Sequence, residues 1–423
     1  MLLTTFVDEI LYFSIRKSSY YKKYIYSKDE TQFKDIINPQ FVFFMSCNYK
    51  QYSDKHDADE QSILIDVKNN EVFLFIGTYT NSDTDDGVFL YKLNTQSGQS
   101  EFISKVQSEN SSFMTLSRDQ KYLYTVGENG AENSKVSSFE LDKSKGILTF
   151  INSRPTYGAD PCYIETNNEE SYLLTANYSG GSITVFPIDE QGVISDAETI
   201  LKFSGSGADS VRQQQSHLHS VRFSPDSKYV FATDLGSDKI YRLNALGSVF
   251  LGQPIISESS LVEFDTPPGT GPRHFDFHPN GEYFYLLGEL SGEVIVYDYN
   301  NGDLIEKQTI LSDTVGARGA ADIHVSSDGR YLYSSNRLEG DGLAIFAIND
   351  EDGTLTRVGF QPTGKHPRNF TITPDGNLLL VAVKDDNRIE IYSIDKETGL
   401  TSILNADINV QQPVFVKSVS ATE

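Results

Sequence analysis

The sequence predicts an all-β fold, a single seven-bladed β-propeller built from four-stranded blades. A common frame recurs from Phe73 onward, consisting of a β-rich run, a tight turn, a second β-rich run and a loop. Copies follow one another at intervals of about 50 residues, as propeller blades do, and helical signals are almost absent. The second runs of the seven copies begin at Phe73, Tyr122, Tyr172, Tyr229, Tyr283, Tyr331 and Leu378.

Tight turns precede most of these second runs. Four of them are Ser224 to Ser227, His278 to Gly281, Ser326 to Gly329 and Thr373 to Gly376. Proline presets the backbone of such turns, and Asn, Asp and Gly tolerate their unusual dihedral angles. A third run follows each pair, and several copies add a fourth after a polar segment. The third runs are 87–93, 135–141, 182–188, 239–243, 293–299, 342–348 and 388–394.

The first copy has no leading strand before Phe73, and the run 413–416 near the other end of the repeats can supply it. Such a strand closes the ring and hides the edges that an open sheet exposes. A solenoid is the competing architecture, but it needs no terminal strand to complete its first unit. We therefore expect residues 413–416 to pair inside the blade that starts at Phe73.

Residues 1–70 lack the repeat and are expected to form an N-terminal extension, poorly ordered or signal-like, ahead of a propeller domain at 71–423. The apolar run 41–47 ends in Cys47 and is similar to the end of a lipoprotein signal. A signal, however, has a short basic start directly before its apolar core, and about forty mixed residues precede this run. We expect a cytoplasmic protein, with an exported lipoprotein anchored through Cys47 as the alternative.

The chain is strongly acidic, with 59 Asp and Glu against 35 Lys and Arg and a net charge of −24. This charge repels nucleic acid and anionic membranes, so an anionic substrate needs a local basic pocket. The two cysteines, Cys47 and Cys162, cannot build a disulfide framework or a four-ligand zinc site. No apolar run approaches the roughly 20 residues of a membrane-spanning helix. We expect a monomer or weak oligomer that binds a small molecule and no metal.

Two positions of the frame face each other across each predicted hairpin, at the end away from the turn. They are the tenth residue before, and the sixth residue after, the start of the second run. Both are polar or ionisable in nearly every copy, so they are expected to ring one mouth of the central channel as a binding site or a solvated rim. The sixth positions are Tyr79, Glu128, Tyr178, Leu235, Glu289, Arg337 and Lys384. The tenth positions are Ser112, Cys162, His219, Arg273, Ala321 and Arg368.

The residues at these positions can supply what hydrolysis of a lactone requires. They can activate a water molecule, donate to the developing oxyanion and give a proton to the ring oxygen of the lactone. We expect Glu289 to activate the water, directly or through His219. Arg273 is expected to face Glu289, keep it ionised and contact the carbonyl oxygen. Arg337 and Arg368 offer forked donors to the anionic end of a substrate.

Other histidines are expected to have lesser roles. The pair His217 and His219 lacks further ligands for a metal ion. His274 follows Arg273 directly, so strict alternation along the strand predicts that it points to the opposite face and is structural. His324 lies at a different level of the frame and is expected to be packed behind the site.

Motifs spread in order over residues 72–417 carry a resemblance to a known family. They are Gly77 to Thr80, Ala176 to Tyr178, His217 to His219, Asp234 to Asp238, Gly271 to His274, Glu289 to Leu290, Ile323 to Val325, Ser335 to Arg337 and Pro367 to Arg368. Through them the chain resembles the lactonases of the bacterial 6-phosphogluconolactonase type, relatives of fungal 3-carboxymuconate cyclase. The stretch 204–215 matches only loosely, and Ser216 stands where the family usually has proline.

The resemblance implies a seven-bladed propeller that handles lactones without a cofactor, with His219, Arg273, Glu289 and Arg337 at the catalytic positions. Hydrolysis of 6-phosphogluconolactone, a reaction of the pentose phosphate pathway type, is the expected activity. Two alternatives stay open: a non-catalytic propeller that binds a ligand or partner, because a fold does not fix a function, and a muconate-type cycloisomerase. The residues expected to contact substrate are Tyr79, Glu128, Tyr178, His217, Asn336 and Arg368.

Overall fold

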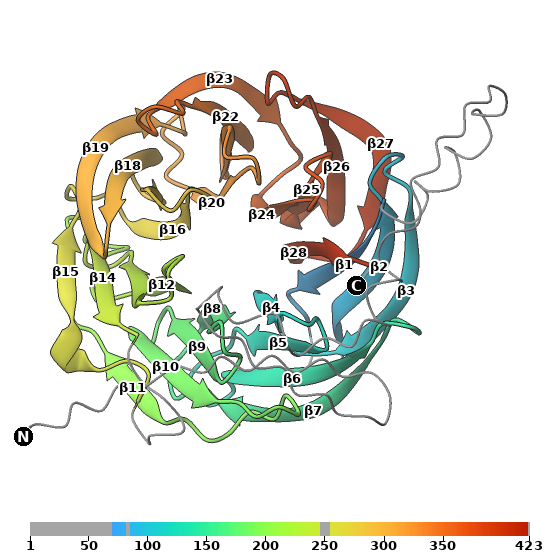
Figure 1. Ribbon diagram of the computed structural model, residues 1–423, viewed down its shortest axis with the longest axis horizontal. Helices are drawn as coiled ribbons and strands as arrows, with labels where there is room; N and C mark the ends of the chain where they lie inside the picture. The colour runs from blue at the N-terminus through green and yellow to red at the C-terminus, as the bar shows by residue number, and fades with distance from the viewer. Residues whose placement is uncertain (1–69, 82–84, 246–253, 422–423) are drawn as a thin grey trace, which may run out of the picture. The chain divides into compact units, whose positions relative to one another are not determined.

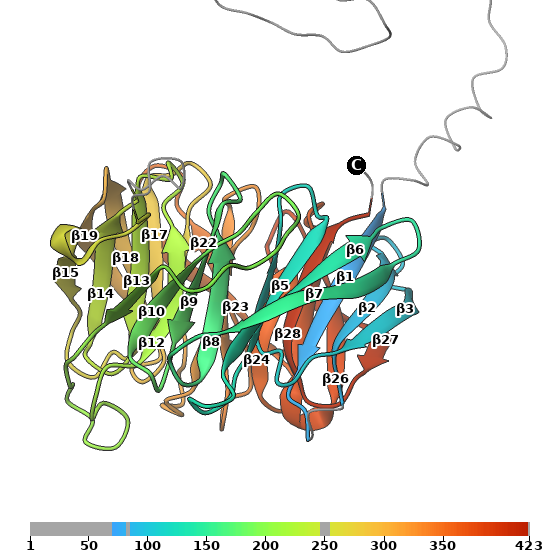
Figure 2. The ribbon, with the colours of Figure 1, turned by 90° about the horizontal axis from the view of Figure 1, so that it is seen from below.

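Seven antiparallel four-stranded sheets stand around a central channel in the computed structural model, which describes residues 70–81, 85–245 and 254–421 (Figure 1). The predicted seven-bladed propeller is confirmed. Figure 2 shows the same sheets from the side, with their strands crossing the ring from one face to the other. The innermost strands, which line the channel, are β28, β4, β8, β12, β16, β20 and β24.

The blades are numbered here from the one that contains the start of the repeats. Blade 1 contains β28 (Pro413–Ser420), β1 (Glu71–Thr78), β2 (Asp86–Asn94) and β3 (Ser100–Gln107). Blade 2 contains β4 (Met114–Leu116), β5 (Tyr122–Gly127), β6 (Lys135–Asp142) and β7 (Ile147–Pro155). Blade 3 contains β8 (Pro161–Thr166), β9 (Tyr172–Asn177), β10 (Ser182–Pro187) and β11 (Thr199–Lys202). Blade 4 contains β12 (Leu218–Phe223), β13 (Tyr229–Asp234), β14 (Lys239–Asn244) and β15 (Val262–Asp265).

The remaining blades follow the same pattern. Blade 5 contains β16 (Pro272–Phe277), β17 (Tyr283–Gly288), β18 (Glu293–Asn300) and β19 (Asp303–Leu311). Blade 6 contains β20 (Ala320–Val325), β21 (Tyr331–Asn336), β22 (Gly342–Ile348) and β23 (Leu355–Pro362). Blade 7 contains β24 (Pro367–Ile372), β25 (Leu378–Val383), β26 (Arg388–Ile394) and β27 (Thr401–Asn409). Among the described residues, two single-turn 3₁₀ helices lie in connections, η3 (Glu258–Ser260) and η4 (Lys384–Asp386).

The second strands of blades 2 to 7 begin at the residues that the repeat frame predicted, and β1 begins two residues ahead of Phe73. The closing strand is also confirmed. β28 pairs antiparallel with β1, from Val72 opposite Ser420 to Thr78 opposite Pro413, and is longer than the predicted run. The last strand of the repeats therefore completes the first blade.

The hydrophobic core consists of seven clusters, each shared by two neighbouring blades. The second strands of the blades, such as β17 and β25, are buried and largely apolar on both faces because each blade is covered on both sides. Between blades 4 and 5, for example, the rings of Phe231 and Phe284 pack with their centroids 5.7 Å apart. The fold is thus stabilised by contacts between blades around the whole ring.

Most inner strands carry a β-bulge at one equivalent position. The pairing with the second strand shifts across Cys162, His219, Arg273 and Arg368, each of which is left without a partner residue opposite it. A bulge adds one residue to a strand and re-aims the local side chains. Four residues of the predicted ring therefore occupy positions where the backbone redirects them toward the channel.

No helix in the described ranges is both long and apolar enough to cross a membrane. Cys47 and the rest of the predicted extension up to residue 69 lie outside the described residues. The second cysteine, Cys162, is a buried free thiol.

Candidate active site

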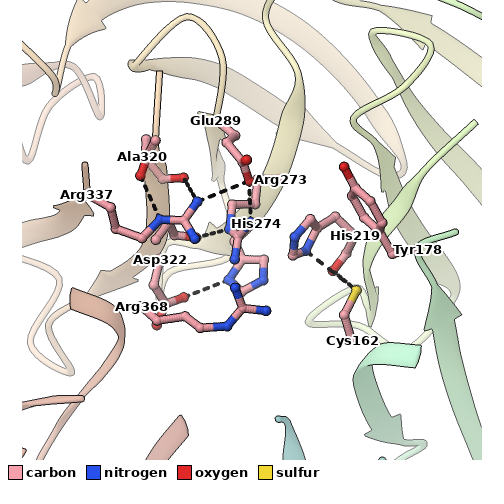
Figure 3. A network of polar contacts seen from close by, with 12 residues as sticks. Cys162, Tyr178, His219, Arg273, His274, Glu289, Ala320, Asp322, Arg337 and Arg368 are labelled. Carbon is pink, nitrogen blue, oxygen red and sulfur yellow. Dashed lines mark hydrogen bonds and ion pairs between the residues drawn. The ribbon is translucent and has the colours of Figure 1, made fainter. Parts of the chain in front are cut away.

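Members of the predicted polar ring, among them His219, Arg273 and Glu289, lie together in one network of side chains (Figure 3). The members of the ring come from two structural positions, the bulge of an inner strand and the residue that follows a second strand. Arg273 and Glu289 represent the two positions in blade 5, where the pair Pro272 and Gly288 closes the hairpin. The predicted approach of Arg273 to Glu289 is confirmed by an ion pair between them.

Glu289 is the centre of a buried ion network. Its Oε2 contacts Arg273 Nη1 and lies 3.4 Å from Arg337 Nη2, and its Oε1 lies 2.7 Å from Arg212 Nη2. Burial alone would raise the pKa of Glu289, but the charges of Arg273, Arg337 and Arg212 hold it well below its usual range. Glu289 is therefore ionised and is a very weak base.

Arg337 has most of its donors occupied within the protein. Its Nε donates to Gly319 O at 2.8 Å, and its Nη2 donates to Ala320 O at 3.3 Å. Burial and the neighbouring charge of Arg273 lower the pKa of Arg337 to about 9. Arg273 uses fewer of its guanidinium donors. Its Nε donates to Ala321 O at 2.7 Å, but its Nη2 forms no hydrogen bond within the described residues.

Arg212 reaches the network from the loop between β11 and β12, a residue that the sequence had not singled out. Its Nη2 also donates to the Tyr178 hydroxyl at 3.3 Å. The loop is tied to the chain before β20 by an ion pair between Asp209 and Arg318. The Arg212 side chain is 39% exposed, whereas the side chains of Arg273 and Glu289 are almost fully buried. Arg212 is thus the arginine of this network that solvent reaches most easily.

His219 is buried beside the network. Its Nδ1 lies 3.7 Å from Cys162 Sγ, and its ring meets the edge of Tyr178 with centroids 5.4 Å apart. The Nε2 atom has no hydrogen-bond partner within the described residues. Burial and the charge of Arg273 lower the pKa of His219 well below its usual value, so its imidazole is neutral at neutral pH.

His274 lies in the channel, contrary to the prediction from strict alternation. The bulge at Arg273 breaks the alternation, and the rings of His274 and His219 meet with centroids 5.2 Å apart (Figure 3). His274 Nδ1 lies 2.8 Å from Asp322 Oδ1, and its buried Nε2 has no hydrogen-bond partner in the part of the chain that the structure describes. The other Asp322 oxygen lies 2.9 Å from His324 Nε2, which agrees with the expected place of His324 behind the site.

A second polar group of the ring consists of Tyr79, Glu128 and Arg368. The Tyr79 hydroxyl donates to Glu128 Oε1 at 2.9 Å, and Arg368 Nη2 lies 3.4 Å from Glu128 Oε2. The Arg368 guanidinium also stands 5.3 Å from the centre of the Tyr79 ring. Its charge contributes to the lowered pKa values of His219 and Arg337, so the two groups belong to one site.

Two of the residues predicted to contact substrate lie outside the centre of this cluster: His217 at its edge and Asn336 apart from it. His217 stacks on Tyr178 with ring centroids 4.3 Å apart, and its Nδ1 contacts Tyr178 O. The Asn336 side chain instead bonds to Ser312, accepting from its hydroxyl at 3.0 Å. Among the described residues, no group of three or more His, Cys, Asp or Glu is arranged to hold a metal ion.

Comparison with known proteins decides the family. Residues 73–418 match the model of a family described as Lactonase, 7-bladed beta-propeller. This chain belongs to the seven-bladed propeller lactonases. Among curated members, a 6-phosphogluconolactonase of Formosa agariphila is 38% identical over 335 residues, which cover 77% of this chain and 93% of the relative. A 6-phosphogluconolactonase of Bacillus subtilis is 33% identical over 351 residues, covering 81% of this chain and 97% of the relative.

Solved structures of propeller lactonases agree with this membership. A Bacteroides fragilis protein, described as a candidate 6-phosphogluconolactonase, superposes with a TM-score of 0.80 at 44% identity, covering 84% of this chain and 99% of that one. The periplasmic gluconolactonase PpgL of Pseudomonas aeruginosa superposes with a TM-score of 0.77 at 30% identity, covering 83% and 100%. The resemblance drawn from the sequence motifs is therefore confirmed.

Proposed function

We propose that this propeller lactonase hydrolyses a sugar-derived lactone, with 6-phosphogluconolactone as the substrate that fits it best. The observation that carries the proposal is a neutral, buried imidazole, His219, beside a fixed cluster of guanidinium groups. This combination supplies both the base and the oxyanion donor that attack of water on a lactone carbonyl requires. The names of the curated relatives support the same substrate class.

In the proposed mechanism His219 Nε2 accepts a proton from water as the water oxygen bonds to the lactone carbonyl carbon. Arg273 Nη2, which is free of other hydrogen bonds within the described residues, stabilises the oxyanion that forms. The bond from the carbonyl carbon to the ring oxygen then breaks, and His219 returns the proton to that oxygen. The products are a carboxylic acid and a hydroxyl group, so atoms and charges balance without a cofactor.

Glu289 has a positioning role in this proposal instead of acting as the base. A carboxylate surrounded by three guanidinium groups has little affinity for a proton, which argues against the direct water activation expected from the sequence. Its charge instead keeps Arg273 and Arg337 in place and offsets their mutual repulsion. The base assignment consequently moves to the neutral imidazole of His219.

The anionic end of the substrate is assigned to Arg212 and Arg368. Arg337 has its donors largely engaged by carbonyl groups, whereas Arg212 is substantially exposed and carries unused donors. Guanidinium groups bind phosphate through paired hydrogen bonds, so these two arginines favour a 6-phosphate over a neutral lactone.

The test is a panel of lactones with and without a 6-phosphate, assayed on the purified full chain and corrected for spontaneous hydrolysis. His219→Asn is expected to lower kcat by about 10²–10⁴-fold, the range for loss of a general base. Glu289→Gln is expected to lower kcat as well but to keep the acid limb of the pH profile, because the imidazole remains. Wild-type kcat in His219→Asn would end the base assignment. Binding of a lactone without turnover would favour the non-catalytic propeller.

We further propose a cytoplasmic location, which agrees with a phosphorylated substrate. Labelling cells with a radioactive fatty acid should leave this protein unmarked. Label on Cys47 would instead establish the lipoprotein alternative.

A further inference from the structure

A cavity of about 400 Å³ opens at the other end of the channel, next to the hairpin turns. Arg222 and Asp276, which line it, lie three residues beyond His219 and Arg273 on the same inner strands. At about 3.3 Å per residue, this places the two groups roughly 10 Å apart along the channel. The cavity is therefore separate from the site around Glu289.

An aromatic layer lies between the two levels. Phe113 stacks on Tyr163 with ring centroids 4.0 Å apart and packs against Phe415 at 4.6 Å. All three line the cavity, while the Tyr163 ring also meets His274, at 5.4 Å, on the side of the catalytic cluster. The cavity thus has an apolar floor suited to a carbon skeleton.

Most of the charged groups in the cavity wall compensate one another. Arg222 Nη1 lies 2.8 Å from Asp276 Oδ1, and Arg222 Nε lies 3.7 Å from Glu165 Oε2. Asp276 also accepts a hydrogen bond from Val325 N at 2.9 Å. His324 also lines the cavity, and its Nε2 is bound to Asp322.

Lys417 on β28 is the exception. It lines the cavity, yet its ammonium group forms no hydrogen bond and no ion pair with any residue that the structure describes. Enclosure in the channel lowers the pKa of Lys417; the charge of Glu165 opposes this in part, and the charge of Arg222 adds to it. Apart from this attraction to Glu165, the ammonium group has no anionic partner among the described residues, which is unfavourable for an enclosed charge.

We propose that this cavity is a second ligand site, which takes a small organic anion, a carboxylate or phosphate on a carbon skeleton, with Lys417 as its ion-pair partner. The anionic group contacts Lys417, and the skeleton lies on the Phe113, Tyr163 and Phe415 layer. The volume falls within the range of small-molecule sites, roughly 300–1,000 Å³. The proposal does not depend on the lactonase reaction, because no residue of the Glu289 cluster lines this cavity.

The test is isothermal titration of the full chain with gluconate, glucose 6-phosphate and inorganic phosphate. Gluconate carries a carboxylate and glucose 6-phosphate carries a phosphate, so the comparison of these two probes shows which anionic group the cavity binds. Inorganic phosphate lacks a carbon skeleton and tests whether the aromatic layer contributes. We expect saturable binding of at least one organic probe at millimolar concentrations, weakened about 10-fold or more in Lys417→Met. Lys92→Met, which removes an exposed lysine of the same blade, should bind as the wild type does. Lys417→Arg should retain binding, which controls for loss of packing.

Proton uptake gives a second readout. Because an anion favours the charged form of Lys417, binding in alkaline solution, well above the pKa of about 7 to which burial raises Glu165, should take up protons. This uptake is seen as a heat that varies with the ionisation enthalpy of the buffer. This uptake should vanish in Lys417→Met. Unchanged affinity in Lys417→Met would place the probe elsewhere, the catalytic end included, and overturn the proposal. So would the absence of saturable binding, or binding of inorganic phosphate as tight as that of the organic probes.

Discussion

At the residue scale, the contrast between Glu289 and His219 shows how neighbours determine which side chain can move a proton. The two side chains lie in the same buried ring. Three guanidinium groups hold the pKa of Glu289 far below neutrality, whereas burial and Arg273 keep His219 uncharged. A free lone pair on an imidazole is therefore present across the neutral pH range, while the carboxylate is committed to its ion pairs.

This leads to a prediction for the pH dependence of the reaction. In the proposed mechanism His219 acts in its neutral form, and burial holds its folded-state pKa well below 6.5. The value of kcat/KM should consequently stay level as the pH falls through 6.5 and decrease only in more acidic solution, where the imidazole gains a proton. A pH–rate profile of the wild type measures this directly. An acid limb centred at or above pH 6.5 would contradict it.

Arg212 yields a prediction about substrate binding. Arg212→Met removes a half-exposed guanidinium that, in the proposed function, contacts the substrate equally in the ground and transition states. It should raise KM for a 6-phosphorylated lactone by about 10-fold with little change in kcat. The KM for the unphosphorylated lactone should hardly change. Arg154→Met is a suitable control, since Arg154 has a similar exposure of 34% but pairs with the surface residue Asp196. An equal effect on both lactones would argue against phosphate binding.

The repeat frame predicted the residues of the site that occupy equivalent positions in the blades, such as Arg273 facing Glu289. It failed where the chain departs from the frame. His274 was assigned to the wrong face because alternation does not include a bulge. Arg212 lies in a loop that has no equivalent position in the other repeats. Asp322 was identified only from the structure, through its contact with His274. A bulge leaves no clear mark in a sequence, and a loop's path depends on contacts such as the one between Asp209 and Arg318.

At the element scale, the tyrosines that begin the second strands connect neighbouring blades. The Tyr331 hydroxyl donates to Glu397 O at 2.6 Å, and the Tyr283 hydroxyl reaches Glu351 O. Each ring lies against a glycine of the outer turn in the next blade, Gly399 or Gly353, both with φ of +71°. The recurrence of Tyr at strand starts and Gly in turns, visible in the sequence, thus has one structural cause.

Gly399→Ala tests this contact. A Cβ there would lie 2.3 Å from the Tyr331 ring, so the ring must move. Gly316 has nearly the same φ, +72°, but nothing lies within 4 Å of its Cβ position. Gly316→Ala should therefore cost about 1 kcal/mol of unfolding free energy from backbone strain, and Gly399→Ala about 1–3 kcal/mol more from overpacking. If urea denaturation gives the same decrease in unfolding free energy for both variants, the Tyr331 ring moves aside without a measurable cost.

At the scale of the whole molecule, the ring closes through its own strands. β28 already covers the edge of β1, so the propeller does not need another segment there. Removal of residues 1–60 should accordingly leave the Tm of the protein nearly unchanged. Differential scanning calorimetry of the shortened and full chains is the measurement. A decrease of several degrees would show that the extension packs against the propeller as structure.

The pairing of β28 with β1 also has a consequence for the time course of synthesis. Leu74 lies opposite Ser418, so more than 300 residues must follow β1 before its partner exists. At about 5–20 residues per second, a ribosome needs roughly 20–70 s to make them. Throughout this interval the inner edge of β1 offers unpaired N–H and C=O groups to any other strand nearby. The edge of β1 therefore stays open to mispairing until synthesis of the propeller is almost finished.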